Sequence, residues 1–327
     1  MPLRRLGPWL GSIVLLAACS GSDDTDPVAS TAAAAVTSTT APAPVAATLP
    51  LTTTAAPTTT TTPPLPVDAS GEPTAPDSVQ EVARRLTFVT ERAQGCGIAA
   101  PPDDCGSLGH HHQVAVRALA REPGWAAQLP SLIDADLAAT TVALVGAGTS
   151  AADSIARPLE AIPAWRIRPP LPIAELRALY DEAEAATGTP WEVLAAVNLV
   201  ETRMGRIVGL SSAGAQGPMQ FIPSTWDLYG EGGDPFDDED AIPAAARLLA
   251  ATGAPDDIDR ALFAYNPSDA YVQAVSGYAE LLAGRPELYD LLWGWQVYVL
   301  TTEGTLWLPE GFETAEPLPV EQYVSQR

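Results

Sequence analysis

A long stretch that cannot build a hydrophobic core restricts what this chain can fold into. Residues 20–76 consist mainly of Thr, Ala, Pro and Ser, with few large apolar side chains. Such a segment cannot bury enough apolar surface to offset the entropy lost on ordering, so the sequence predicts a disordered, semi-extended linker. Folding is therefore expected in the roughly 250 residues that follow, which suffice for one large or two small domains.

The residues before this linker are typical of an export signal. Arg4 and Arg5 precede a mostly apolar run that is too short for a permanent membrane-spanning helix. The run closes on Leu-Ala-Ala-Cys, which resembles the lipobox of bacterial lipoproteins. The resemblance implies that residues 1–19 form a lipoprotein signal and that Cys19 carries lipid, which would anchor the mature, extracytoplasmic protein at the outer face of the cell membrane. An ordinary secretory signal is the alternative.

Two cysteines remain once Cys19 is assigned to the lipid. Cys96 and Cys105 form an even pair, which an oxidising compartment would join as a disulfide that closes a short loop. A pair of free thiols and a metal-binding pair are the alternatives. Both are disfavoured because no further cysteine lies nearby.

The net charge of −23 limits the partners of the chain. All 17 basic residues are Arg, a composition typical of a high-GC bacterial genome. So acidic a chain cannot neutralise a row of phosphates, which argues against nucleic-acid binding. It also offers no long-range attraction to an anionic polymer, so such a substrate would have to be held by short-range contacts.

Hydrophobic periodicity divides the folding part into two helical regions and a β tail. Residues 77–157 are predicted to be a helical accessory region, and several prolines between residues 158 and 172 mark its boundary. Region 158–284 is helical again, and residues 285–327 add a short helix and a β-hairpin pattern. The sequence therefore predicts a mainly α fold with a small C-terminal β appendage. Within the accessory region the expected helices run from 77 or 78 to about 94, from about 107, and over 129–157.

Three consecutive histidines at positions 110–112 raise the question of a metal site. Consecutive side chains on a helix point about 100° apart, whereas chelation needs spacings near i and i+4. No cysteine or carboxylate is placed to complete a ligand set. We therefore expect no metal here and interpret the histidines as the solvated start of a helix.

The most informative helix is expected to begin at Thr189 and to stop at Gly205. Thr189 would cap it, with Pro190 at the first helical position and Glu192 completing a capping box. Glu201 then falls in the last turn, where the negative end of the helix dipole and the apolar neighbours both disfavour its charged form. Both effects raise the pKa of this carboxyl, as a general acid near neutral pH requires.

The residues after this helix favour catalysis over the alternative, a surface ion pair of Glu201 with Arg203 or Arg206. The run S-S-A-G-A-Q-G-P-M-Q-F-I-P-S-T-W occupies residues 211–226, and its two glycines would let the backbone approach a ligand closely. A Tyr-Asn-Pro sequence follows at 265–267, where the proline places the Tyr-Asn pair at the end of a helix.

Together these motifs resemble those of the lytic transglycosylases of the lysozyme-like superfamily, over roughly residues 173–282, and most closely the membrane-bound B-type branch. The family's pattern is a catalytic Glu at a helix end, S-x-x-G-A-x-G-x-M-Q, P-x-T and a Y-N pair, all present here in this order. The resemblance implies a lysozyme-like α+β catalytic lobe that cleaves peptidoglycan glycan strands without a cofactor. It also implies the site residues, namely catalytic Glu201 and the sugar subsite residues Ser211, Gln220, Tyr265 and Asn266.

The resemblance implies a single carboxylate, and two other functions compete with it. A lysozyme-type muramidase would use a second carboxylate from residues 234–240, and a non-catalytic wall-binding lipoprotein would use none. B-type relatives often carry a calcium-binding-like loop, but residues 231–234 lack alternating ligand positions, so we expect no structural calcium. Asp237, Asp238 and Asp240 are interpreted as favourable charges at a helix N-terminus.

Overall fold

The computed structural model describes residues 65–96, 104–155 and 157–327. The predicted signal of residues 1–19, the lipid site at Cys19 and the linker as far as residue 64 lie outside the described residues. The described part is mainly helical, as the sequence predicts. A membrane-spanning helix, long and apolar enough to cross a bilayer, is not found in this part of the chain.

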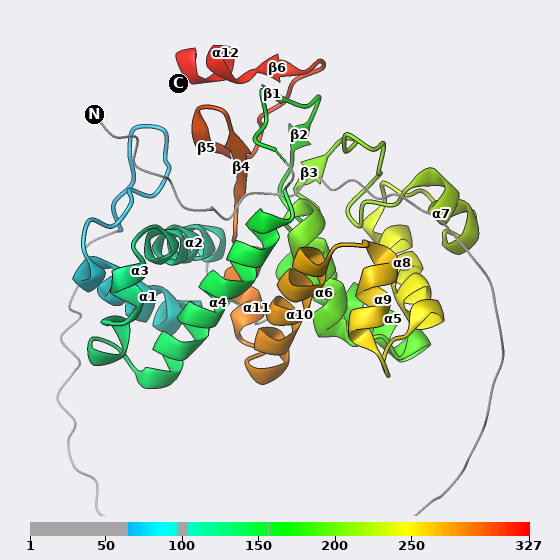
Figure 1. Cartoon of the computed structure of the whole chain (residues 1–327), viewed down its shortest axis with the longest axis horizontal. Helices are drawn as coiled ribbons and strands as arrows, with labels where there is room; N and C mark the ends of the chain where they lie inside the picture. Colours follow the sequence, from blue (N-terminus) through cyan, green and yellow to red (C-terminus); the bar gives the residue numbers. More distant parts are fainter. Residues whose placement is uncertain (1–64, 97–103, 156) are drawn as a thin grey trace, which may run out of the picture. The chain divides into compact units, whose positions relative to one another are not determined.

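Helices make up most of this structure, and short strands connect some of them (Figure 1). The helices are α1 Val79–Ala93, α2 Cys105–Arg121, α3 Pro123–Ala126, the 3-10 turn Leu129–Ser131, α4 Ala135–Asp153, α5 Ile173–Thr187, α6 Trp191–Thr202, α7 Pro223–Tyr229, α8 Asp238–Thr252, α9 Ile258–Tyr265, α10 Asp269–Gly284, α11 Leu288–Trp293 and α12 Val320–Ser325. The strands are β1 Ala161–Ile162, β2 Arg166–Ile167, β3 Ile207–Val208, β4 Val297–Thr301, β5 Gly304–Leu308 and β6 Leu318–Pro319.

Helices from both predicted helical regions share one hydrophobic core. α10 lies against α4 of the N-terminal region and also against α6 (Figure 1). The contact with α4 is close because both helices offer small residues: a Cβ on Gly277 would lie 3.2 Å from the Cβ of Ala147. Gly109 of α2 and Gly294 after α11 also meet closely, since a Cβ on Gly294 would lie 2.8 Å from the Cα of Gly109. Packing is therefore continuous from the N-terminal helices to the helices of region 158–284.

The strands of the described chain pair as three small antiparallel sheets. β4 and β5 form the predicted C-terminal hairpin, with Val297 opposite Leu308 and Thr301 opposite Gly304, so this prediction is confirmed. β1 pairs with β6 and thereby joins the segment after α4 to the C-terminal segment, while β2 pairs with β3 directly after α6. Apolar side chains from these sheets form a second, smaller core.

Some predicted helix ends are wrong because local capping decides them. The helix predicted over residues 129–157 consists of a 3-10 turn and then α4, which begins at Ala135. Asp134 sets this start, since its carboxylate accepts hydrogen bonds of 2.9 and 3.1 Å from the backbone N–H groups of Asp136 and Leu137. The helix predicted from about residue 107 begins at Cys105 instead. Ser78 caps α1 as expected.

The predicted linker extends too far at its C-terminal end. Residues 65–76 lie within the described chain and form a turn, in which the Asp68 carboxylate accepts a 2.8 Å hydrogen bond from the Ser70 backbone. Glu72 accepts a 3.0 Å hydrogen bond from the Tyr298 hydroxyl and pairs with Arg327 at 3.1 Å. Composition alone missed these contacts because the partners are distant in the sequence.

Cys96 and Cys105 form a disulfide, the pair that the sequence predicts. Both cysteines are buried, and Cys105 is the first residue of α2. The bridge therefore joins the segment after α1 to the start of α2, and these two helices also pack against each other.

The interpretation of the three histidines as a solvated helix start is wrong, since His110, His111 and His112 are buried within α2. His110 Nε2 lies 2.9 Å from the Tyr298 hydroxyl, and the Trp295 indole N–H donates to His112 Nδ1 over 3.1 Å. Burial lowers the pKa to about 3 for His110 and to about 4 for the other two, so they are neutral core side chains. The described residues contain no group of three or more His, Cys, Asp or Glu side chains placed so that they could bind a metal ion.

Candidate active site

α6 carries Glu201 through the core. Every residue of this helix from Val193 to Thr202 is buried. The predicted capping box is wrong: Pro190 precedes the first helical residue, and the Thr189 hydroxyl donates a 3.0 Å hydrogen bond to the carbonyl oxygen of Ala246 in α8. The start of α6 is therefore tied to α8 by a tertiary contact, which no local sequence pattern reveals.

The chain leaves α6 in an unusual backbone conformation. Arg203, Met204 and Gly205 have φ values of 55°, 60° and 78°, so the helix ends at Thr202, earlier than predicted. Non-glycine residues in this left-handed region cost about 1–3 kcal/mol each and tend to cluster at functional sites. This strain lies directly after Glu201.

Side chains of α6 hold the motif loop of residues 211–221 against the helix. The Asn198 amide and the Thr202 hydroxyl donate hydrogen bonds of 2.9 and 2.6 Å to the carbonyl oxygen of Pro218. The Tyr180 hydroxyl from α5 donates in turn to the Asn198 amide oxygen over 2.7 Å. This buried network fixes the loop relative to the helix that carries Glu201.

The two glycines of the motif loop have left-handed backbone conformations but different surroundings. Gly217 has a φ of 71°, and a Cβ at this position would overlap the carbonyl oxygen of Pro235. Its missing side chain therefore makes room for the neighbouring chain at Pro235 and Phe236, and the approach of a ligand stays a prediction. Gly214 has a φ of 79°, but nothing lies within 4 Å of a Cβ built there.

The Glu201 carboxyl has the properties of a group that holds its proton near neutral pH. Its side chain is buried, with the residue only 4% exposed. Burial raises the pKa of this carboxyl to about 8, and the Tyr271 hydroxyl opposes this effect by lowering it. Among the described residues no second carboxylate contributes to the shift. Glu201 is therefore a buried carboxyl that keeps its proton near neutral pH.

The alternative of a surface ion pair at Glu201 is wrong. Arg203 is buried, with its guanidinium 5.9 Å from the ring centroid of Trp295. Arg206 is also buried, where it pairs with Glu310 and donates a 3.1 Å hydrogen bond to the carbonyl oxygen of Trp293. Both arginines are thus engaged with the C-terminal part of the chain.

Two tyrosines lie beside Glu201, the fully buried Tyr271 and the half-buried Tyr265, and only Tyr265 was predicted. Tyr265 ends α9, and Tyr271 lies in the first turn of α10. Their rings stack with centroids 6.4 Å apart and planes 7° apart. Burial, and then the charge of Glu201, raises the pKa of both hydroxyls. Tyr271 was missed because a tyrosine near the start of an amphipathic helix is usually an ordinary core residue.

The other predicted subsite residues make local contacts within the described chain. The Ser211 hydroxyl accepts hydrogen bonds from the backbone N–H groups of Ala213 and Ala215, at 3.2 and 3.0 Å. The Gln220 amide donates over 2.9 Å to the carbonyl oxygen of Gly217, and Asn266 is buried where α9 ends. The structure thus places Tyr265 beside Glu201, while the sugar contacts of Ser211, Gln220 and Asn266 stay predictions.

The aspartates at 234–240 have structural partners. Asp237 caps α8 by accepting a 3.0 Å hydrogen bond from the Glu239 backbone, and Asp240 accepts one of 2.8 Å from the Asp234 backbone. Asp238 is buried in an ion pair with Arg168. Asp237, Asp238 and Asp240 thus lie at the start of α8, which confirms their interpretation as charges of a helix N-terminus.

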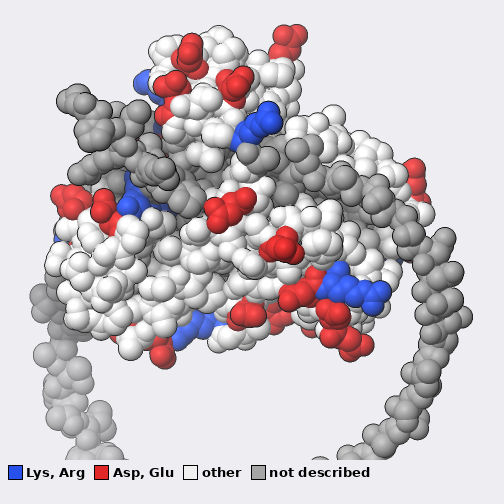
Figure 2. Space-filling model, in the orientation of Figure 1, with Lys and Arg blue, Asp and Glu red and all other residues white. Residues whose placement is uncertain are grey.

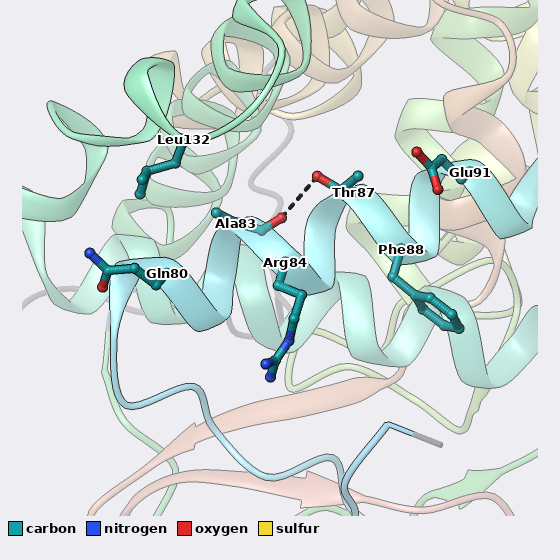
Figure 3. A pocket seen from close by; sticks show the side chains of 7 residues that line it. All are labelled: Gln80, Ala83, Arg84, Thr87, Phe88, Glu91 and Leu132. Atoms are coloured by element: carbon teal, nitrogen blue, oxygen red, sulfur yellow. Dashed lines mark hydrogen bonds between the residues drawn. The ribbon is translucent and has the colours of Figure 1, made fainter. Parts of the chain in front are cut away.

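Two hollows on the described surface lie away from the predicted site residues. One of about 410 Å³ is lined by the exposed side of α1, including Gln80 and Phe88, together with Leu132 (Figure 3). Another of about 490 Å³ is lined by Trp307, Phe312 and other residues of the C-terminal segment. Neither contains a residue of the predicted site.

Comparisons with protein-family models, with curated proteins and with solved structures find no match.

The buried carboxyl predicts a pH-dependent difference in stability between the wild type and Glu201→Gln. The pKa is about 8 in the folded chain, against an ordinary value of 4.5, so the folded state binds more protons than the unfolded state between these values. Wild-type stability therefore falls as the pH rises through this window, by on the order of 4–5 kcal/mol in total. The neutral amide of the variant does not lose stability in this way. The variant should therefore be more stable than the wild type at pH 9, and the difference in free energy of unfolding should be smallest in its favour at pH 4.

Denaturant unfolding of both proteins at pH 4, 6.5 and 9 measures this difference. The buried histidines titrate in both proteins, so their contribution cancels when one curve is subtracted from the other. Parallel stability curves for the two proteins would show that Glu201 is not buried in a neutral form.

Proposed function

We propose that this protein is a peptidoglycan lytic transglycosylase that cleaves the β-1,4 bond between N-acetylmuramic acid and N-acetylglucosamine. We further propose that region 158–284 is its lysozyme-like catalytic lobe. The observation that supports this proposal most strongly is the buried carboxyl of Glu201, whose pKa is raised to about 8 with no second carboxylate of the described residues acting on it. The order of the surrounding motifs supports the same function.

One carboxyl is sufficient for this reaction because it acts twice. Protonated Glu201 donates its proton to the glycosidic oxygen, and the bond from this oxygen to C1 of the muramic residue breaks. The resulting carboxylate then takes the proton of the muramic 6-hydroxyl, whose oxygen attacks C1. The product carries a 1,6-anhydro end, no water is consumed, and Glu201 is protonated again.

The acidic character of the chain fits recognition by short-range contacts. On the face shown in Figure 2, acidic side chains are widely spread and basic ones are few. Long-range attraction of an anionic glycan is therefore not expected. Amide side chains such as those of Gln220 and Asn266 can bind acetamido and hydroxyl groups without charge, because each offers both a donor and an acceptor.

The Cys96–Cys105 disulfide supports an extracytoplasmic location, where such bonds form and persist. We propose that the lipid at Cys19 anchors the protein and that the Pro- and Thr-rich segment tethers the folded part to the membrane.

Digestion of purified peptidoglycan with the mature protein, followed by mass analysis of the products, tests the proposed function. A lytic transglycosylase yields anhydromuramic ends, which are lighter by one water than hydrolysed ends. Glu201→Gln serves as the control for contaminating activity. Products with only reducing, hydrated ends would indicate a muramidase, and an absence of soluble products would indicate a wall-binding protein.

A further inference from the structure

We propose that Tyr271, rather than the motif residue Tyr265, is the tyrosine that orients the Glu201 carboxyl and stabilises its charged form during the reaction. This inference deepens the proposed function and rests on it. It concerns a positioning residue, because Tyr271 acts on Glu201 and not on the substrate.

The hydrogen-bond donors of the two tyrosines are used differently. A phenol has one proton to donate, and Tyr265 donates it to the carbonyl oxygen of Met219. That contact ties α9 to the motif loop, which also carries Pro218, the residue bonded to α6. Tyr265 therefore supports the loop and has no second proton for Glu201.

The Tyr271 hydroxyl, in contrast, is fully buried and forms no regular hydrogen bond within the described chain. A buried hydroxyl without a regular partner keeps its proton free to donate, so what distinguishes Tyr271 is the group next to it. The position of the side chain is well defined: Ser268 accepts a 3.4 Å hydrogen bond from the Tyr271 backbone N–H, and the ring stacks on Tyr265. The hydroxyl therefore has a fixed position, and its proton is available for a hydrogen bond to a neighbouring group.

The Tyr271 hydroxyl interacts electrostatically with Glu201. After burial, the charge of Glu201 is the largest cause that raises the pKa of Tyr271, and the hydroxyl in return lowers the pKa of Glu201. A hydrogen-bond interaction between the two side chains contributes to both pKa shifts, although its geometry falls short of a regular hydrogen bond. Catalytic hydrogen bonds are often long in a free enzyme and shorten when charge develops. Here charge develops on Glu201 as soon as it has given its proton to the glycosidic oxygen.

The role of Tyr271 follows from the two halves of the reaction. In the first half Glu201 is neutral and needs no donor. In the second half it is a buried carboxylate, and a donated hydrogen bond would compensate for part of its lost hydration. Tyr271 would keep its own proton throughout and donate a hydrogen bond to the carboxylate until the muramic 6-hydroxyl proton arrives.

The test compares Tyr271→Phe with Tyr278→Phe in the full-length protein. Tyr278 is a matched control: it lies on the same helix, is equally buried, and its hydroxyl also lacks a regular partner, but its neighbouring charge is Arg203. The carboxyl of Glu201 is titrated by NMR with isotope-labelled glutamate, and its signal is assigned from its absence in Glu201→Gln. The pH profile of kcat/KM is measured alongside.

We expect Tyr271→Phe to raise the pKa of Glu201 by about one pH unit, to move the pH profile by the same amount towards alkaline pH, and to lower kcat roughly tenfold. Tyr278→Phe should leave both titration and profile unchanged. Tyr265→Phe should reduce activity without this titration shift, since its proton belongs to Met219.

An unchanged Glu201 titration in Tyr271→Phe would overturn the inference, as would an equal shift in Tyr278→Phe. The NMR titration requires no turnover, so it decides the role of Tyr271 even where the wild type releases no anhydro product. Failure of the proposed function is therefore distinguishable from failure of this inference.

Discussion

Glu201→Gln is expected to reduce the rate of glycan cleavage by at least about 10²–10⁴-fold. The amide has nearly the same shape as the carboxyl but can neither give nor take a proton, so both halves of the proposed reaction lose their acid and base. The measurement is the rate at which anhydromuramic products are released from purified peptidoglycan. Since the variant should fold at least as well as the wild type, lost activity cannot be attributed to unfolding.

Asp234→Asn and Asp237→Asn are the matched controls, because they remove a carboxylate from the region where a hydrolase would keep its second one. Both side chains accept hydrogen bonds from nearby backbone N–H groups, so we expect small losses of activity. Inactive aspartate variants together with hydrated products would contradict the one-carboxylate mechanism. An active Glu201→Gln variant would move the chemistry away from α6 altogether.

Gly217→Ala should destabilise the folded protein by about 3 kcal/mol or more, and activity should be lost with it. The new Cβ would overlap the carbonyl oxygen of Pro235, and the φ of 71° is unfavourable for alanine as well. Backbone on both sides must shift, which would pull the motif loop away from its bonds to Asn198 and Thr202. Thermal and denaturant unfolding measure the loss.

Gly214→Ala isolates the backbone contribution to this effect. Its φ of 79° is close to that of Gly217, but nothing lies within 4 Å of the added Cβ. We expect a loss of about 1 kcal/mol, as for alanine in the left-handed region alone. Equal losses in the two variants would show that the close approach of Pro235 does not matter.

Much of the helical fold could be predicted from the sequence because it depends on local patterns. The periodicity of apolar residues predicted the helices that became α1, α5 and α10, and an alternating pattern predicted the β4–β5 hairpin. Helix ends were less predictable, since some are decided by distant partners. Thr189 has a good capping sequence around it, yet its hydroxyl bonds to α8.

In the candidate site, too, features that depend on local sequence could be predicted, and features that depend on distant contacts could not. A motif indicated Glu201, and its helix-end position and apolar neighbours predicted the direction of its pKa shift. The burial of Arg203 and Arg206, the buried histidines of α2 and the proximity of Tyr271 could not be predicted, because each depends on which elements meet in three dimensions. His110 and His112 in particular form hydrogen bonds with Tyr298 and Trp295, far along the chain.

The shared position of α10 has a consequence for how the chain can be divided. One face of this helix contacts α4 closely, at Gly277 and Ala147, and another contacts α6. A fragment that began at residue 158 would leave the α4-facing side of α10 uncovered by its native partner, in the helix that holds Tyr271 beside Glu201. In the whole chain, α4 therefore helps to hold α10 in place beside the site. Hydrogen exchange in α4 and α10 should accordingly report a single cooperative opening.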